Sequence, residues 1–316
     1  MAATFPRRFP SISSAAHRVE WPTCLLIAVV YGAWFAAVMQ AQRLGGFVSN
    51  AMLIVLGCWF MSLQHELLHG HPTRHRSLNR LLGLAPLAVW YPYDLYRAGH
   101  LAHHRDELLT EPGIDPESNY IAAADFARLH PALRPFWMAQ RTVLGRVLLG
   151  PAMVILPTWL DIVRRPLRGD WHQTPAWALH LSLLAALLWA LDRYAGIGPL
   201  RYMLAIAYPA LGLAMLRSFF EHRPAALPAH RVVINEAAPF WRLLYLNNNY
   251  HSVHHELPSL PWYRIRARYL AEREAVLARN GGFLVAGYGA LLWRYALTPI
   301  DSPVHPPMAS SVDVAS

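Results

Sequence analysis

The sequence predicts an all-α integral membrane protein with about four transmembrane helices in two hairpins and a cytosolic helical cap. Three observations support this prediction. Of 316 residues, 55% are hydrophobic and only 15% are charged, whereas soluble domains are about one quarter charged. Several uncharged stretches approach the roughly 20 residues that a helix needs to cross a bilayer. The 17 histidines are concentrated in segments that follow or flank these stretches.

The first hairpin is predicted from two neighbouring apolar stretches. Residues 21–42 carry no charge, and a second uncharged stretch covers residues 44–64. Only Arg43 separates the two, so the connection is short and the helices should be antiparallel. The second stretch continues directly into the first histidine-containing segment, His65–His69.

A second apolar pair at about residues 175–191 and 202–220 predicts the other hairpin, with Asp192, Arg193 and Arg201 in its connection. The arginine-rich amino terminus and the arginine-dense segment 74–105 should face the cytoplasm, because positive charge favours that side. We therefore expect a multi-pass protein, in a bacterial inner membrane, with its histidine clusters and active site on the cytoplasmic side.

Two stretches, 81–93 and 143–160, fit a re-entrant, an interfacial or a spanning segment. The first is short, and the second contains Pro151 and Pro157. We favour a re-entrant or interfacial placement, because histidine clusters that share one site must be separated by an even number of crossings. Residues 258–280 alternate charged and apolar side chains and predict an amphipathic helix. The expected organisation is a partly disordered lead-in (1–20), one catalytic domain (21–300) and a disordered tail (301–316).

The net charge of +9 comes entirely from arginine. Because the arginines lie beside apolar segments, they suit a membrane surface or an acidic protein partner, and we expect no nucleic-acid partner. Cys24 and Cys58 lie within apolar stretches. They predict small core residues, with neither a disulfide framework nor a cysteine metal site.

Three histidine clusters carry the chemistry. Their sequences are HELLH, HLAHH and HSVHH, and their eight histidines are His65, His69, His100, His103, His104, His251, His254 and His255. On a helix, positions i, i+3 and i+4 share a face, so each cluster can direct its imidazoles to one place. A single HxxxH pattern arises by chance, but three such clusters beside membrane segments do not. Eight imidazoles exceed what one tetrahedral zinc requires and suffice for two metal ions with open positions.

Two other functions are weaker interpretations of these histidines. The segment His65–His69 matches the H-E-x-x-H pattern of zinc peptidases, with Glu66 as the general base, but this leaves the other six histidines without a role. A histidine-rich metal transporter would need ionisable residues deep within its spans. The first two predicted spans have essentially none.

The clusters HxxxH, HxxHH and HxxHH, with membrane helices between the second and third, resemble those of the membrane fatty acid desaturases and the related lipid hydroxylases and ketolases. The resemblance covers about residues 25–260. It implies two iron ions, O2 as co-substrate and a fatty acyl or other lipid chain as substrate, with desaturation favoured and hydroxylation or ketone formation as alternatives. Because the sequence shows no haem, flavin, nicotinamide or iron–sulfur motif, electrons should come from a separate ferredoxin, rubredoxin or cytochrome with its reductase.

The resemblance also implies further ligands. His222 lies where an additional ligand is expected after the last membrane helix, and Asn247, four residues before His251, would ligate a metal through water. A turn or helix cap is an equal alternative for Asn247. Hydrogen-bond partners of the ligands are expected among His71, Glu66, Asp106, Glu107 and Glu256, although these acids could equally pair with nearby arginines. The isolated His75, His130, His172, His180, His230 and His305 receive no metal role.

Overall fold

A computed structural model describes residues 19–104 and 108–307 of the chain. Apart from two short strands, the elements in these ranges are helical, which confirms the predicted fold class. The α-helices are α1 (Trp21–Met39), α2 (Ala41–Leu68), α3 (Arg76–Gly83), α4 (Tyr93–His103), α5 (Ala123–Arg128), α6 (Arg134–Ala139), α7 (Val143–Leu167), α8 (Thr174–Ala190), α9 (Pro199–Tyr202), α10 (Tyr208–Arg217), α11 (Pro239–Leu244), α12 (His251–Glu256), α13 (Trp262–Ala271), α14 (Arg273–Arg279) and α15 (Tyr288–Tyr295).

Short helical turns and one small sheet complete the fold. The turns are η1 (Pro131–Leu133), η2 (Leu191–Ala195), η3 (Met203–Ala207), η4 (Ser218–Phe220) and η5 (Pro228–Arg231). Strand β1 (Ile234–Asn235) pairs in parallel with β2 (Leu284–Val285). The turns η3 and η4 extend α10 at both of its ends.

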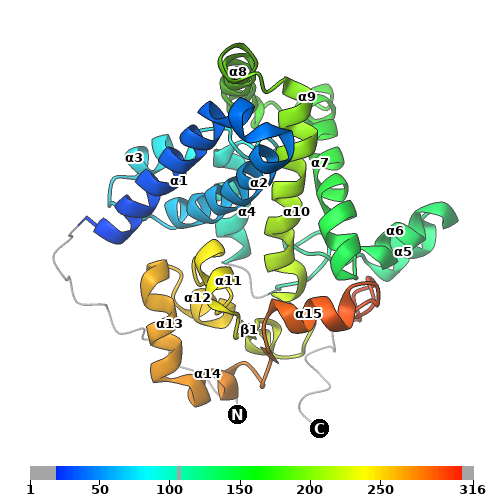
Figure 1. The fold of residues 1–316 in the computed structure, drawn as a ribbon. Helices are drawn as coiled ribbons and strands as arrows, with labels where there is room; N and C mark the ends of the chain where they lie inside the picture. The colour runs from blue at the N-terminus through cyan, green and yellow to red at the C-terminus, as the bar shows by residue number, and fades with distance from the viewer. Residues whose placement is uncertain (1–18, 105–107, 308–316) are drawn as a thin grey trace, which may run out of the picture.

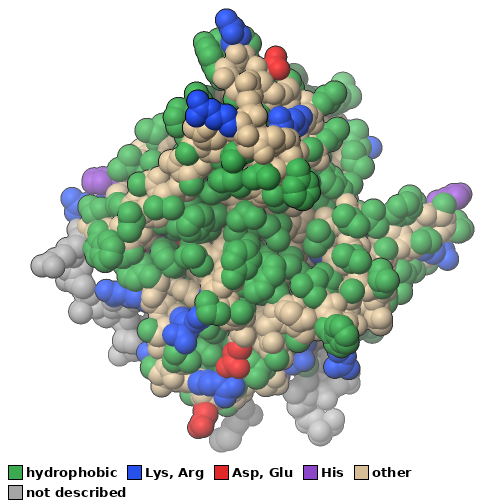
Figure 2. Space-filling view, in the orientation of Figure 1, with side chains coloured by type: hydrophobic (Ala, Val, Ile, Leu, Met, Phe, Trp, Pro, Cys, Tyr) green, Lys and Arg blue, Asp and Glu red, His purple; other side chains and the backbone are tan. Residues whose placement is uncertain are grey.

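Five helical segments in the described ranges are long and apolar enough to cross a membrane: Trp21–Met39, Ala41–Leu68, Val143–Leu167, Thr174–Ala195 and Pro199–Phe220. Helix α1, with 19 residues, has a length of about 28 Å, close to the roughly 30 Å of a hydrocarbon core. Large apolar side chains of these segments point outward, as Phe47, Leu156 and Leu200 show. Figure 2 shows that such side chains form a belt across the middle of one face, with charged groups above and below it. This surface suits a lipid environment.

The region 143–160 forms one continuous helix, a form that suits a spanning or an interfacial segment. Pro151 and Pro157 do not interrupt it, because α7 continues over 25 residues with both prolines inside. Helix α7 packs against α10, and the two stand side by side in Figure 1. Gly212 makes this close approach possible, because a Cβ atom there would lie 2.3 Å from the carbonyl oxygen of Val147. The other ambiguous stretch, 81–93, contains only the end of α3 and an irregular connection to α4.

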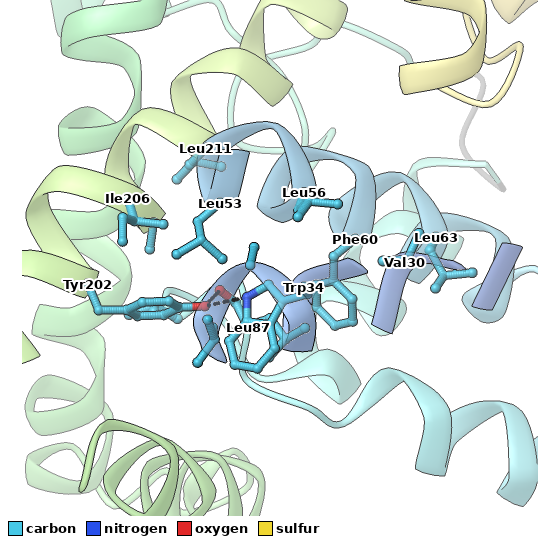
Figure 3. Packing of buried hydrophobic residues seen from close by; sticks show 14 of the residues in the cluster. Val30, Trp34, Leu53, Leu56, Phe60, Leu63, Leu87, Tyr202, Ile206 and Leu211 are labelled. Atoms are coloured by element: carbon cyan, nitrogen blue, oxygen red, sulfur yellow. Dashed lines mark hydrogen bonds between the residues drawn. The ribbon is translucent and has the colours of Figure 1, made fainter. Parts of the chain in front are cut away.

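The main apolar core lies where α1 and α2 meet the η3–α10 segment (Figure 3). Val30, Leu53 and Phe60 have no exposed surface. At one side of this cluster the Trp34 indole donates a hydrogen bond to the Tyr202 hydroxyl at 3.3 Å, and that hydroxyl donates to the carbonyl oxygen of Leu87 at 3.0 Å. The core therefore fixes the end of α2 that carries the first histidine cluster.

Helices α11 to α15 and the small sheet form a cap below the long helices in Figure 1. Two predictions for this part need correction. The expected single helix over 258–280 is two helices, α13 and α14, because Glu272 has a non-helical backbone. Residues 301–307 of the expected disordered tail are packed against the domain through a bridge between Ile121 and Val304. Residues 1–18 of the expected lead-in and 308–316 of the tail lie outside the described residues.

Candidate metal centre

Four segments deliver histidines to one place between the long helices and the cap. Helix α2 carries His65 in its last turn and is capped by His69, and α4 carries His100 and His103, with His104 at its cap. His222 follows the end of η4 and forms a bridge with Val232. Helix α12 provides His251, His254 and His255. Segments separated by up to 190 residues therefore meet, as the three clusters predicted.

The imidazoles form two groups, each able to surround one ion. The first group is His65, His69, His100, His104 and His254, and the second is His103, His222, His251 and His255. Within each group the possible ligand atoms lie within 4.8 Å of one another. The groups are neighbours, because the rings of His104 and His255 stack with centroids 4.3 Å apart.

The spacing of the ring nitrogens fits metal ligation. In the first group, the Nε2 atoms of His69 and His100, of His100 and His104, and of His104 and His254 are 3.0 Å apart. In the second, the corresponding distances from His103 to His222, from His222 to His251 and from His251 to His255 are 3.1 Å. Nitrogens about 2.1 Å from one ion are about 3.0 Å apart at a right angle but about 3.4 Å apart in a tetrahedron. Both groups therefore suit right-angled coordination better than tetrahedral zinc.

Hydrogen bonds at the opposite ring nitrogens support this arrangement. His100 Nδ1 donates to a carboxylate oxygen of Glu117 at 2.6 Å, and His103 Nδ1 donates to Asp115 at 2.8 Å. Because a carboxylate only accepts, these bonds leave the Nε2 lone pairs free to face the centre of each group. His65 Nε2 is buried without a hydrogen-bond partner among the described residues. Converging lone pairs and an unsatisfied nitrogen are what a bound cation would stabilise.

Burial keeps most of these imidazoles neutral. It lowers the pKa of His104 to about 2 and that of His222 to about 3, and it holds the pKa values of His254 and His255 well below the usual range. Neutral imidazole is the form that binds a metal. His103 differs: burial lowers its pKa, but the carboxylates of Glu117 and Asp115 outweigh burial and raise it.

The structure does not support Glu66 and Glu256 as hydrogen-bond partners of the histidine ligands. Glu66 accepts a hydrogen bond from the backbone N–H of Trp262 at 3.1 Å and lies 4.0 Å from His65 Nδ1, too far for a hydrogen bond. Glu256 forms a two-pronged ion pair with Arg279. The predicted roles of these two carboxylates are therefore wrong. Asp106 and Glu107 lie outside the described residues.

His71 and Asn247 occupy other positions than predicted. His71 belongs to neither group, and its Nδ1 lies 2.8 Å from Glu20 at the start of α1. Asn247 does not share a helical face with His251, because α12 begins only at His251. Asn247 instead lies in a turn with φ of 58°, where its amide donates to the Trp262 carbonyl at 2.9 Å. The alternative of a turn residue describes it correctly.

Asp115 and Glu117 are functional candidates that the sequence reasoning missed. They lie in an irregular segment more than ten residues after the second cluster, and no spacing rule connects them to it. Asn248 is a third such residue, because its side-chain oxygen lies 3.2 Å from His251 Nδ1. A possible signal was the concentration of acidic residues between positions 106 and 117.

Comparisons with known proteins agree with this geometry. Residues 42–286 match the model of the family described as fatty acid desaturase. The chain is also similar to the human (Homo sapiens) sphingolipid delta(4)-desaturase/C4-monooxygenase DES2, with 24% identity over 277 residues that cover 82% of this chain and 76% of the relative. The matched region contains every histidine of both groups. The chain therefore belongs to the fatty acid desaturase family and is an enzyme of the desaturase and hydroxylase type.

Proposed function

We propose that this protein is a membrane-bound, O2-dependent di-iron oxidoreductase that introduces a double bond into a lipid hydrocarbon chain. The observation that carries the proposal is the pair of adjacent histidine groups with nitrogen spacings of 3.0 and 3.1 Å. In the first ion site, His65, His69, His100, His104 and His254 would hold the metal. In the second, His103, His222, His251 and His255 would do so.

When bound, iron and O2 supply the oxidising power that amino-acid side chains lack. Desaturation removes two hydrogens from neighbouring carbons. With two electrons and two protons from an external donor, these hydrogens reduce one O2 to two waters. The chain's own residues keep the imidazoles neutral and oriented: Glu117 and Asp115 fix His100 and His103 by hydrogen bonds. We infer a separate ferredoxin, rubredoxin or cytochrome with its reductase as the electron source.

The substrate proposal rests on the surroundings of the site. Helix α2 is a candidate membrane span that carries His65 in its last turn, so the histidine groups lie at the end of an apolar segment and suit a substrate with a hydrocarbon chain. The name of the human relative joins a desaturase with a monooxygenase. The same centre can therefore support insertion of a hydroxyl group as the alternative outcome. We place the centre on the cytoplasmic side, where the flanking arginines favour it.

A zinc peptidase is the less favourable function. In that enzyme class the glutamate of H-E-x-x-H must face the metal-bound water as general base. Here the Glu66 carboxylate binds the backbone of Trp262 and is absent from both groups. The right-angled nitrogen spacing also argues against a tetrahedral zinc site.

Two measurements test the proposal. Metal analysis of the purified protein should give two irons per chain, whereas one zinc would contradict it. Expression with a matched electron donor and reductase, followed by mass spectrometry of host lipids, should reveal a loss of two hydrogens in one lipid class. The gain of one oxygen would select the hydroxylase. His103→Ala should abolish either product, and the exposed His172→Ala should retain it.

A further inference from the structure

The segment Ile300–His305, here called the carboxy-terminal strap, is joined to the metal centre by a continuous series of contacts. Its backbone pairs with Ile121: the N–H of Ile121 donates to the Pro303 carbonyl, and the N–H of His305 donates to the Ile121 carbonyl, both at 2.9 Å. The strap therefore lies against the 108–121 loop that carries Asp115 and Glu117. The expectation of a disordered tail gave this segment no role.

An ion pair fixes the strap further along. Arg141, with 1% of its surface exposed, donates from Nε to Asp301 at 2.6 Å, and the Tyr120 hydroxyl donates to the other oxygen of Asp301 at 2.7 Å. The backbone N–H of Ile300 donates to the Arg141 carbonyl at 2.9 Å. Without Asp301, the charge of the buried Arg141 would have no carboxylate partner, which is energetically costly. The ion pair therefore stabilises the packed position of the strap.

His305 connects the strap to the 108–121 loop by a hydrogen bond. Its Nδ1 lies 2.7 Å from the Pro306 carbonyl oxygen, which only accepts, so Nδ1 carries the proton and Nε2 accepts. The acceptor Nε2 lies 2.9 Å from the Thr110 hydroxyl, which therefore donates to it. The ring of His305 is buried against Tyr120. His305, expected to be isolated, is thus part of the packed interior.

Thr110 is held in an unfavourable backbone conformation at this point. Its φ is 74°, a left-handed value that a β-branched residue rarely adopts. Its N–H donates to Asp115 at 2.8 Å. The second oxygen of Asp115 accepts from His103 at 2.8 Å and from the backbone N–H of Glu117 at 2.9 Å. Such a conformation persists only where surrounding contacts enforce it, and the strap provides one of them.

We propose that the carboxy-terminal strap is a positioning element of the metal centre: through His305 and Thr110 it sets Asp115, which orients His103. The series runs from His305 Nε2 to the Thr110 hydroxyl, from the Thr110 N–H to Asp115, and from Asp115 to His103. This inference rests on the proposed metal binding. Neither His305 nor Thr110 belongs to the histidine groups.

The test measures how fast the iron-loaded protein loses metal to a chelator, together with the thermal stability of the metal-free protein. Thr110→Val removes the hydroxyl but keeps the β-branched shape, so metal loss should be faster by about three- to tenfold. Asp115→Ala should accelerate it by about 10- to 100-fold, in line with the loss of metal affinity when a ligand loses its hydrogen-bond partner. Thr110→Ser keeps the hydroxyl and should behave like the wild type. His305→Ala should match Thr110→Val.

The decisive measurement repeats His305→Ala in a protein that already carries Asp115→Ala. If the strap acts through Asp115, the second change adds less than twofold to the rate of metal loss. Equal effects of His305→Ala in both backgrounds would overturn the proposal, as would unchanged metal loss in Thr110→Val. A wild-type protein that binds no iron pair would instead contradict the proposed function. Loss of metal in Asp115→Ala but not in His305→Ala would refute the strap alone.

Discussion

The two histidine groups differ in what holds them. In the first group, His65 belongs to α2, a helix of 28 residues packed into the main apolar core, and His69 caps that helix. In the second, His222 follows a short helical turn, and His103 depends on Asp115 in an irregular loop. The first group thus includes a ligand from the longest helix of the described residues, α2. The second takes its ligands from the shorter helices α4 and α12 and from His222, which lies outside a helix, and it has four histidines rather than five.

The largest expected effect comes from removing one ligand from each group. His103→Ala leaves three histidines in the second group, whereas His254→Ala leaves four in the first. We expect both variants to lose iron and product formation, with the greater loss of bound metal in His103→Ala. Iron per chain, measured by mass spectrometry of the purified protein, checks this order. His172→Ala, in the exposed α7–α8 connection, serves as control. Equal iron content in all three variants would refute the ligand assignment.

The next largest effect should come from removing the two carboxylates that accept hydrogen bonds from the ligands, and it should differ between the two groups. Glu117→Ala takes the acceptor from His100 of the first group, and Asp115→Ala takes it from His103 of the second. Each should weaken metal affinity by about 10- to 100-fold. Because Asp115 also accepts from the backbone of Glu117, its loss should weaken both sites, whereas Glu117→Ala removes a ligand's hydrogen bond in the first group alone and should weaken that site more. Chelator titration with two resolvable phases would show this, and a single identical phase in both variants would contradict it.

This asymmetry also explains which parts of the site the sequence could predict. Histidines repeated at i, i+3 and i+4 beside apolar stretches predict their own convergence, because the periodicity is local. Asp115 and Glu117 could not be assigned, since their positions depend on the strap almost 190 residues later. The acidic residues next to the histidines were chosen instead, and Glu66 and Glu256 proved to serve other contacts. Adjacency in sequence does not decide which carboxylate meets a ring nitrogen.

For the fold as well, local sequence patterns predicted some parts correctly and left others open. Hydropathy predicted the helices at 21–42, 44–64, 175–191 and 202–220, because long apolar stretches have few alternatives to a membrane helix. It left the region of α7 open between a re-entrant, an interfacial and a spanning segment, and the observed helix is continuous through Pro151 and Pro157. Prolines are tolerated there because packing against α10 stabilises the helix. Such a tertiary contribution is invisible to a local pattern.

A third prediction concerns the support of the second group by α10. At Gly212 a Cβ atom would lie 2.3 Å from the carbonyl oxygen of Val147, so Gly212→Ala must separate α7 from α10. We expect a loss of about 1–3 kcal/mol in stability and faster metal loss from the second group, because α10 leads to His222. Thermal unfolding in detergent and the order of metal loss measure this. Gly32→Ala, which meets nothing within 4 Å, is the matched control. Equal stability of the two variants would contradict the packing argument.

The smallest expected effect should be shared by both groups. The backbone of α12 and its preceding turn is bound to the β1 region, where Ser252 N–H donates to the Val233 carbonyl and Asn235 N–H to the Asn249 carbonyl. Glu236, next in the chain, accepts hydrogen bonds from Arg273 and Tyr269, and these lower the pKa of its carboxyl. Because α12 supplies His254 to one group and His251 and His255 to the other, weakening this contact should not discriminate between them.

Glu236→Gln tests this last expectation through its dependence on pH. The folded-state pKa of Glu236 lies below the unfolded value, so the stabilisation is complete above about pH 4.3 and disappears as the pH falls through the folded value. For a partly exposed ion pair we expect about 0.5 kcal/mol at pH 7. The difference in melting temperature between wild type and Glu236→Gln should therefore shrink on acidification. Glu274→Gln, at an exposed site on α14, is the matched control. If Glu236→Gln released metal from one group only, α12 would not be the common support of both, and the contrast between the groups would have to extend into the cap.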